Sequence, residues 1–378
     1  MPKIAHLHGD NMADPRVESF ARILVDYCTR IQTGDRVYIE TSTEALPMLQ
    51  EVFKQVLQRG GRPYVQMEFP EQRELYFEYM PYEPEAHKNE LMAYAYEHFE
   101  ARIRLWSEVN TKALMNADSK KQSAWAEGNS STLKSQFERG ATGDFKWVTT
   151  LYPTRGYASQ AGMGFIEYEN FVYKAIHALE KDPVSYWKHV KETQKKYIQA
   201  LHGHDRVELR GPNVELSLSI KGRTFLNSHG LHNMPDGEIY TGPVENSLNG
   251  WVRYTYPAVE MGVVVEGAEL HFEDGKVTKA TAGVREDFLK QMIATDAGSA
   301  YVGEFAFGLN KDIDRFTGHI LFDEKIGGSF HMALGAGYPE TGSKNNSAIH
   351  WDMICDLRQD SEITVDGDLF YKNGEFVI

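Results

Sequence analysis

The sequence predicts an α/β N-terminal domain with a parallel sheet, followed by an α+β, mainly β C-terminal domain. Two observations lead to this fold class. At 378 residues, the chain exceeds the size at which a single hydrophobic core usually stops growing. Helical and strand patterns alternate in its first half, whereas short strands and glycine turns prevail after about residue 203. We therefore expect domains at residues 1–203 and 204–378.

The first half begins with a strand–helix–strand pattern. Asp14-Pro15 predicts an N-cap followed by proline at the first position of a helix. Residues 36–40 predict a strand, residues 43–58 a helix, and residues 63–67 a second strand. Gly60-Gly61 ends the helix between these strands. This spacing predicts a parallel strand pair joined by a crossover helix.

The rest of the first half continues this alternation. Residues 103–106 and 147–151 predict two more strands, with a polar helical stretch between them. Residues 168–201 predict a helix that is interrupted near Asp182-Pro183. These elements complete the α/β domain.

Short strands dominate the second half. Residues 214–220 alternate apolar and polar side chains, and residues 263–265 form an apolar run. Asp274-Gly275 and Asp366-Gly367 predict tight hairpin turns. One helix, at residues 286–294, interrupts the strands. The pattern is typical of a mainly β domain.

Composition excludes several classes of protein. Apolar residues make up 42% and charged residues 25% of the chain, as in ordinary globular proteins. The formal net charge of −14 argues against nucleic-acid or anionic-membrane partners, which need a basic patch. No apolar stretch approaches the roughly 18 residues of a membrane span, and the first residues lack the apolar core of a signal peptide. We expect a cytoplasmic location.

Two stretches near the C-terminus place a histidine inside an apolar run. They are residues 329–335, which contain His331, and residues 348–352, which contain His350. Asp352 follows His350 by two residues. On an extended strand, these two side chains leave the same face. An imidazole and a carboxylate that converge on one point are suited to bind a metal ion.

Five residues of the C-terminal domain are candidate metal ligands: Glu245, Glu304, His331, His350 and Asp352. Singly, each has a simpler interpretation. Glu245 follows a Gly-Pro turn and fits a solvated position, His331 fits a core histidine, and an H-x-D spacing is a weak motif. Jointly, two imidazoles and three carboxylates suit a pair of divalent ions such as Zn²⁺, Co²⁺ or Mn²⁺. Two such ions can hold a hydroxide nucleophile at neutral pH.

Tyr338 is a candidate catalytic residue beside these ligands. It lies seven residues after His331, behind two glycines that allow the backbone to approach a ligand. Its phenol is suited to donate to an oxyanion, and packing at a turn is the alternative interpretation. The sequence contains no P-loop, no G-x-S-x-G elbow, no H-E-x-x-H and no dinucleotide-binding glycine motif.

Taken together, the motifs resemble the thermophilic-type metallo-aminopeptidases, the family of aminopeptidases T and S. The likeness extends over nearly the whole chain. The motifs that carry it are, in order, Leu24-Val25-Asp26-Tyr27, Thr33-Gly34-Asp35-Arg36-Val37-Tyr38-Ile39, Asn233-Met234-Pro235-Asp236-Gly237-Glu238-Ile239-Tyr240-Thr241-Gly242-Pro243-Val244-Glu245, Gly303-Glu304, His331-Met332-Ala333-Leu334-Gly335 with Tyr338-Pro339, and Ile349-His350-Trp351-Asp352.

The resemblance implies a dinuclear site formed by the five candidate ligands, with Tyr338 beside it. It implies hydrolysis of N-terminal residues from peptides by a metal-bridged hydroxide, with Glu304 or Glu245 as proton shuttle. It also implies a homodimer that partly encloses the active sites. The interval between His331 and His350 is short for the family, and this loop is expected to shape the substrate cavity.

Two alternatives stay open. The first is a ring-cleaving dioxygenase of dihydroxypyridines, which is similar in fold and binds one iron(II). Such iron is suited by two histidines and one carboxylate, which His331, His350 and Asp352 would supply. The additional carboxylates of Glu245 and Glu304 favour a second ion instead. The other alternative is a non-catalytic, metal-stabilised dimer that binds peptides, because fold does not fix function.

Overall fold

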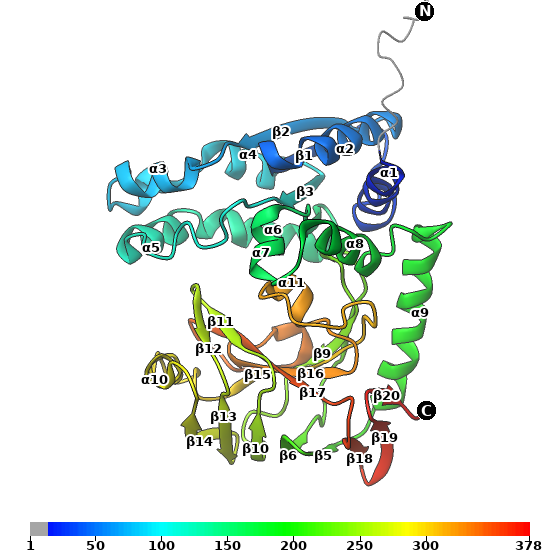
Figure 1. Ribbon diagram of the computed structural model, residues 1–378, viewed down its shortest axis with the longest axis vertical. Helices are drawn as coiled ribbons and strands as arrows, with labels where there is room; N and C mark the ends of the chain where they lie inside the picture. The colour runs from blue at the N-terminus through cyan, green and yellow to red at the C-terminus, as the bar shows by residue number, and fades with distance from the viewer. Residues whose placement is uncertain (1–13) are drawn as a thin grey trace, which may run out of the picture. The chain divides into compact units, whose positions relative to one another are not determined.

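The predicted fold class is confirmed by the computed structural model, which describes residues 14–378 (Figure 1). The chain forms two compact units. The first contains the described part of Met1–Val109 together with Asn116–Thr154 and Ile176–Val184, and the second contains Asn110–Met115, Arg155–Ala175 and Ser185–Ile378. The domain boundary expected after residue 203 stays a prediction.

The first unit is built on a parallel sheet with the strand order β2-β1-β3-β4. Strand β1 pairs with β2 on one side and with β3 on the other. Helix α2 connects β1 to β2, so the predicted crossover helix is confirmed. The strands are β1 (Arg36–Ser42), β2 (Arg62–Glu68), β3 (Ala101–Trp106) and β4 (Lys146–Leu151).

The helices of the first unit begin as the sequence predicts. The Asp14 carboxylate accepts a hydrogen bond from the Arg16 amide at 2.9 Å, and Pro15 is the first helical residue. The polar stretch between β3 and β4 is helical, as expected. The helices are α1 (Pro15–Arg22), continued by a π-helical segment (Ile23–Cys28), a 3-10 turn (Thr43–Ala45) that leads into α2 (Leu46–Gln58), α3 (Gln72–Tyr79), a 3-10 turn (Pro84–His87), α4 (Glu90–His98), α5 (Ser119–Gly128) and α6 (Ser130–Thr142).

The second unit contains an eight-stranded antiparallel sheet of the order β14-β13-β10-β6-β5-β18-β19-β20 and a five-stranded antiparallel sheet of the order β17-β16-β15-β9-β7. Both predicted hairpins are confirmed, as β13–β14 and β18–β19. The first sheet contains β5 (Arg206–Gly211), β6 (Val214–Ser219), β10 (Asn249–Arg253), β13 (Glu269–Glu273), β14 (Lys276–Thr281), β18 (Glu362–Val365), β19 (Asp368–Lys372) and β20 (Glu375–Phe376).

The five-stranded sheet contains β7 (Leu226–Ser228), β9 (Glu238–Thr241), β15 (Val302–Gly308), β16 (Ser329–Gly335) and β17 (His350–Asp356). A separate hairpin joins β11 (Ala258–Glu260) to β12 (Val263–Val265), and β8 (Asn233–Met234) precedes β9. The helices of this part of the chain are α7 (Arg155–Gln160), α8 (Phe165–Ala175), α9 (Pro183–Leu201), α10 (Glu286–Ile293), α11 (Ile320–Asp323) and a 3-10 turn (Pro339–Thr341).

The core of the second unit lies between these two sheets. The eight-stranded sheet contributes Leu209, Leu216 and Val252, and the five-stranded sheet contributes Phe305 and Met332, all fully or almost fully buried. Because side chains alternate along a strand, only one face of the five-stranded sheet is used by this core. The other face is available for a site.

None of the helices within residues 14–378 is both long enough and apolar enough to span a membrane. The N-terminal residues on which the expected cytoplasmic location depends lie outside the described residues.

Candidate metal centre

The candidate ligands emerge from one face of the five-stranded sheet. Asp352 on β17 lies opposite Ala333 on β16, which in turn lies opposite Glu304 on β15. His331 is two residues from Ala333 along β16, and it lies opposite Ala306. Residues that are directly opposite, or two apart on one strand, share a face. Strand register therefore brings Glu304, His331 and Asp352 together.

Small residues make room for these side chains. Three small residues lie on the same face of the sheet as the ligands: Ala306, Ala333 and Gly335. The residues opposite them belong to β9, β15 and β17. The alternate positions carry large residues such as Phe305 and Trp351, which belong to the core. On a strand that is buried on both faces, successive side chains point alternately into the core and into the site, rather than into the core and into water. This explains why His331 lies in an apolar run.

Three side chains form the centre of the cluster: Glu238, Glu304 and His331, all buried. Their ligand atoms lie within 4.8 Å of one another. Nε2 of His331 is 3.3 Å from Oε1 of Glu304 and 3.4 Å from Oε2 of Glu238. This arrangement allows one cation to contact two carboxylates and an imidazole.

His350 and Asp352 extend the cluster, as their spacing predicts. Nε2 of His350 is 3.6 Å from Oε2 of Glu304 and 3.7 Å from Oδ1 of Asp352. The other ring nitrogen, Nδ1, lies 2.7 Å from the carbonyl oxygen of Ala336. A proton on Nδ1 donates to this carbonyl and leaves the Nε2 lone pair free. Metal-binding histidines are commonly oriented by such a contact.

The structure does not bring Glu245 together with the other four candidates. Its carboxylate accepts a hydrogen bond from Arg223 at 2.6 Å and another from the Lys344 amide at 2.6 Å. Glu245 lies four residues beyond Thr241, where β9 ends. It therefore falls outside the row of residues that the sheet holds in register.

Glu238 is the residue that sequence reasoning missed. It begins β9, next to the fully buried Ile239, and it is itself almost fully buried. The motif from Asn233 to Glu245 contains both glutamates. The signal that distinguishes them is local. Glu238 opens an apolar strand, where a carboxylate needs a partner, whereas Glu245 follows a Gly-Pro turn.

Tyr338 lies beside the cluster, as expected. Its ring centroid is 5.3 Å from that of His350 and 5.4 Å from that of Tyr240, both in edge-to-face geometry. Burial of its hydroxyl, followed by the nearby carboxylates of Glu304 and Asp352, raises the pKa of Tyr338. The phenol is thus protonated at neutral pH. The residue is 40% exposed, so it is accessible to a substrate.

The pKa values of three residues in the cluster are shifted from their ordinary values. Burial raises the pKa of Glu238 to about 8, against the opposing effect of Lys325. Burial lowers the pKa of His331, but contacts with Glu304 and Glu238 outweigh it and raise that pKa to about 9. Burial also raises the pKa of Asp352. Without a metal ion, these groups keep their protons, because several negative charges buried close together repel one another.

The residues fit a bound cation. Oε2 of Glu238 and Oδ1 of Asp352 are buried, and neither has a hydrogen-bond partner among the described residues. Buried polar atoms without partners are rare, and each calls for an explanation. Both atoms are carboxylate oxygens, which supply negative charge. A mixed set of carboxylates and imidazoles suits divalent Zn²⁺, Co²⁺ or Mn²⁺.

Two further charged residues border the cluster, and sequence patterns did not point to them. Lys325 is fully buried, and its Nζ lies 2.9 Å from Oε1 of Glu238. Glu260, on β11, is electrostatically coupled to Asp352 and His350. Burial, with a smaller contribution from Asp352, raises the pKa of Glu260 to about 7.

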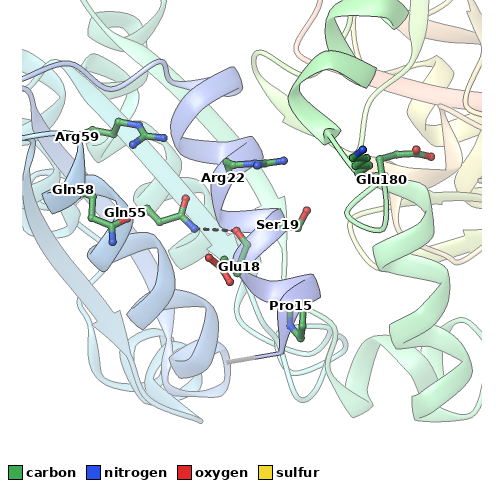
Figure 2. A pocket seen from close by; sticks show the side chains of 9 residues that line it. Pro15, Glu18, Ser19, Arg22, Gln55, Gln58, Arg59 and Glu180 are labelled. Atoms are coloured by element: carbon green, nitrogen blue, oxygen red, sulfur yellow. Dashed lines mark hydrogen bonds between the residues drawn. The ribbon is translucent and has the colours of Figure 1, made fainter. Parts of the chain in front are cut away.

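A separate cleft of about 370 Å³ lies in the first unit, beside α1 and α2 (Figure 2). Its guanidinium groups have acidic partners. Arg59 binds Asp26 through two contacts of 2.7 Å, and Arg22 lies 3.7 Å from Asp182. The pattern is that of a solvated polar surface, and it differs from the unbalanced carboxylate cluster of the second unit.

The chain belongs to the thermophilic metalloprotease (M29) family, whose model matches residues 13–376. Its relatives include aminopeptidase AmpS from Bacillus subtilis (strain 168), 24% identical over 96% of this chain and 98% of the relative. Aminopeptidase 2 from Geobacillus stearothermophilus is also 24% identical, over 94% and 96%. These matches confirm the resemblance drawn from the sequence motifs, and they support assignment to the metallo-aminopeptidases.

Solved structures confirm the fold. AmpT from Thermus thermophilus superposes with a TM-score of 0.82 at 20% identity, over 96% of this chain and 99% of that one. A dihydroxypyridine dioxygenase from Pseudomonas putida KT2440 superposes with a TM-score of 0.58 at 12% identity, over 96% of both chains. At such identities the likeness concerns the fold alone.

Proposed function

We propose that this protein is a metal-dependent aminopeptidase that removes N-terminal residues from peptides. The observation that carries the proposal is the buried cluster of carboxylates and imidazoles, in which two carboxylate oxygens have no hydrogen-bond partner among the described residues, in a chain of the metalloprotease family. The aminopeptidase names of relatives that match nearly the whole chain favour an exopeptidase.

The ligands in this proposal are Glu238, Glu304, His331, His350 and Asp352. Glu238 takes the place that sequence analysis gave to Glu245, because Glu238 shares the cluster and Glu245 is bound to Arg223. A pair of divalent ions is the expected content. When bound, such ions supply Lewis acidity and a water acidic enough to act as nucleophile at neutral pH.

The chain's own residues supply proton transfer and orientation. Glu304, in the centre of the cluster, accepts a proton from the attacking water and returns it to the leaving amine. The hydroxyl of Tyr338 donates to the oxyanion that forms on the scissile carbonyl. Glu260 offers a further carboxylate near Asp352, suited to hold the positively charged amino group of the substrate.

The dioxygenase alternative has one observation in its favour, the similarity of fold to the Pseudomonas enzyme. The donor set argues against it. Two histidines and one carboxylate suffice for iron(II), whereas here Glu238 and Glu304 add two buried carboxylates beside His331. We therefore expect two divalent ions per chain.

The test combines metal analysis with an activity assay. Protein loaded with Co²⁺ or Zn²⁺ is expected to contain about two ions per chain and to hydrolyse aminoacyl-p-nitroanilides. Peptides with a blocked amino group are expected to be stable. One oxygen-sensitive iron per chain with ring cleavage of a dihydroxypyridine would establish the dioxygenase instead. Metal binding without turnover of any substrate in the panel would favour the non-catalytic, peptide-binding dimer.

A homodimer and a cytoplasmic location remain part of the proposal. The dimer follows from the family resemblance, and sedimentation analysis of the loaded protein tests it. The cytoplasmic location stays a prediction.

A further inference from the structure

Lys325 is an unusual lysine because it is completely buried. Its side chain has 0% exposure, and Nζ contacts Oε1 of Glu238 at 2.9 Å and also the carboxylate of Glu324. Lysines are rarely buried unless they are paired, because removing an ammonium group from water is unfavourable. A buried lysine beside a candidate metal ligand therefore calls for a specific role.

The backbone holds Lys325 and Glu238 in a fixed relation. The Asn310 amide donates to the carbonyl of Lys325 at 3.0 Å, and the Asn310 side chain donates to the carbonyl of Asp236 at 3.0 Å. The Leu309 amide donates to the carbonyl of Gly237 at 2.8 Å. Residues 309–310 thus bind both the segment that carries Lys325 and the segment that leads into Glu238.

The contact with Lys325 distinguishes the two oxygens of Glu238. Oε1 is occupied by the ammonium group, whereas Oε2 has no hydrogen-bond partner among the described residues and lies 3.4 Å from Nε2 of His331. A carboxylate without such a contact is free to rotate and to offer either oxygen or both. Partners behind a ligand commonly set its orientation and tune its affinity for metal.

We propose that Lys325 is a positioning residue that holds Glu238 as a one-oxygen ligand, with Oε2 directed at the metal. This inference rests on the proposed function, because it takes Glu238 to be a ligand. A lysine that served only the stability of the fold would leave the metal's coordination unchanged once the protein is folded.

The test compares Lys325→Met with Lys311→Met. Lys311 is 69% exposed and pairs with Glu375 at 2.5 Å, so this control removes an exposed lysine–glutamate pair. Metal-free proteins are titrated with Co²⁺ by calorimetry, and the visible absorption of bound Co²⁺ is recorded. We expect Lys325→Met to weaken the affinity by about 10- to 100-fold and to change the absorption spectrum. Lys311→Met should match the wild type in both.

Lys325→Met leaves two carboxylates without their cation, so a double variant with Glu324→Gln provides a less charged background. If the single variant does not fold, the double variant is titrated with Co²⁺ and its result is interpreted in the same way. A folded variant that has either wild-type affinity or a wild-type Co²⁺ spectrum overturns the inference, even if its melting temperature falls.

Glu238→Gln separates this inference from the proposed function. We expect Glu238→Gln to lose affinity for Co²⁺. If it binds Co²⁺ like the wild type, Glu238 is not a ligand and the proposed centre itself is wrong. If Glu238→Gln fails to bind while Lys325→Met binds normally, the centre stands and only the role of Lys325 is refuted.

Discussion

Each unit of the molecule contains a buried cluster of charged residues on a sheet, and the two clusters differ in how the charges of their carboxylates are balanced. In the first unit, Glu40 on β1 lies beside Arg102 and Arg104 on β3. Arg104 binds both oxygens of Glu40 at 2.9 and 3.0 Å, and the Tyr96 hydroxyl donates to Glu40 at 3.2 Å. The carboxylate thus has its counter-charges within the protein.

The cluster of the second unit has carboxylates in excess. Glu238, Glu304 and Asp352 face two imidazoles and the single ammonium group of Lys325. The pKa values reflect this difference. Burial tends to raise the pKa of Glu40, but Arg104 and Arg102 outweigh it and lower that pKa, whereas burial raises the pKa of Glu238 to about 8. A buried cluster whose carboxylates are balanced by internal cations supports the fold, and a cluster with carboxylates in excess indicates a ligand site.

The largest expected effect comes from Glu304→Gln. Turnover of an aminoacyl-p-nitroanilide by metal-loaded protein should fall by about 10²- to 10⁴-fold, since a proton-transfer group and a ligand charge are lost. The free energy of unfolding of the metal-free protein should change little, because the change removes one of several like charges together with a contact to His331. Near-normal turnover would take Glu304 off the list of catalytic residues.

Glu40→Gln should show the opposite pattern. It leaves the buried Arg102 and the half-buried Arg104 beside a neutral amide, and breaking a buried pair from one side typically costs about 3–5 kcal/mol. We expect that loss in urea unfolding, with no change in Co²⁺ affinity. A Glu40→Gln protein as stable as the wild type would break the comparison between the clusters.

Two tyrosines sharpen the same comparison. Tyr96 accepts hydrogen bonds from Arg102 and Arg104 at 2.8 Å each, so Tyr96→Phe should cost about 1.5–3 kcal/mol of stability. Tyr338→Phe should leave stability nearly unchanged and lower kcat by about 10²- to 10³-fold, as expected for an oxyanion donor. If Tyr338→Phe lowers stability and leaves kcat unchanged, the tyrosine only packs at its turn.

Much of the fold was predictable because its signals are local. The Asp14 cap, the crossover unit from residue 36 to residue 68 and the hairpin turns at Asp274-Gly275 and Asp366-Gly367 depend on neighbouring residues. The His350–Asp352 pair was predictable for the same reason, since a strand fixes the direction of residues two apart. The structure brings both side chains to Glu304 and His331.

The rest of the site depends on contacts between distant segments. The choice between Glu238 and Glu245 is set by where β9 ends, and that end is defined by pairing with β15, more than 60 residues away. Lys325 lies in an ordinary-looking turn, and only the folded chain shows that it contacts Glu238. Burial alone distinguishes it from the chain's exposed lysines, and burial is a property of the assembled unit.

A further expected effect is a pH dependence that separates the clusters. Glu238 has a pKa of about 8 in the fold against an ordinary 4.5, so the metal-free folded protein keeps a proton that the unfolded chain has lost between these values. His331, at about 9 against 6.5, acts in the same direction. Stability of the metal-free protein should therefore fall as pH rises from about 6.5 to 9, and Glu238→Gln should make this fall shallower.

The lowered pKa of Glu40 has the opposite sign, because its contribution is lost only as pH falls below the ordinary range of a carboxyl group. Metal reverses the trend at the candidate centre, since its ligands bind in their deprotonated forms. Urea unfolding at pH 6 and pH 9, with chelator and with Co²⁺, measures both trends. If the chelated protein gains stability between these pH values, or if Glu238→Gln leaves the slope unaltered, the excess of buried carboxylates is not what distinguishes the second cluster from the first.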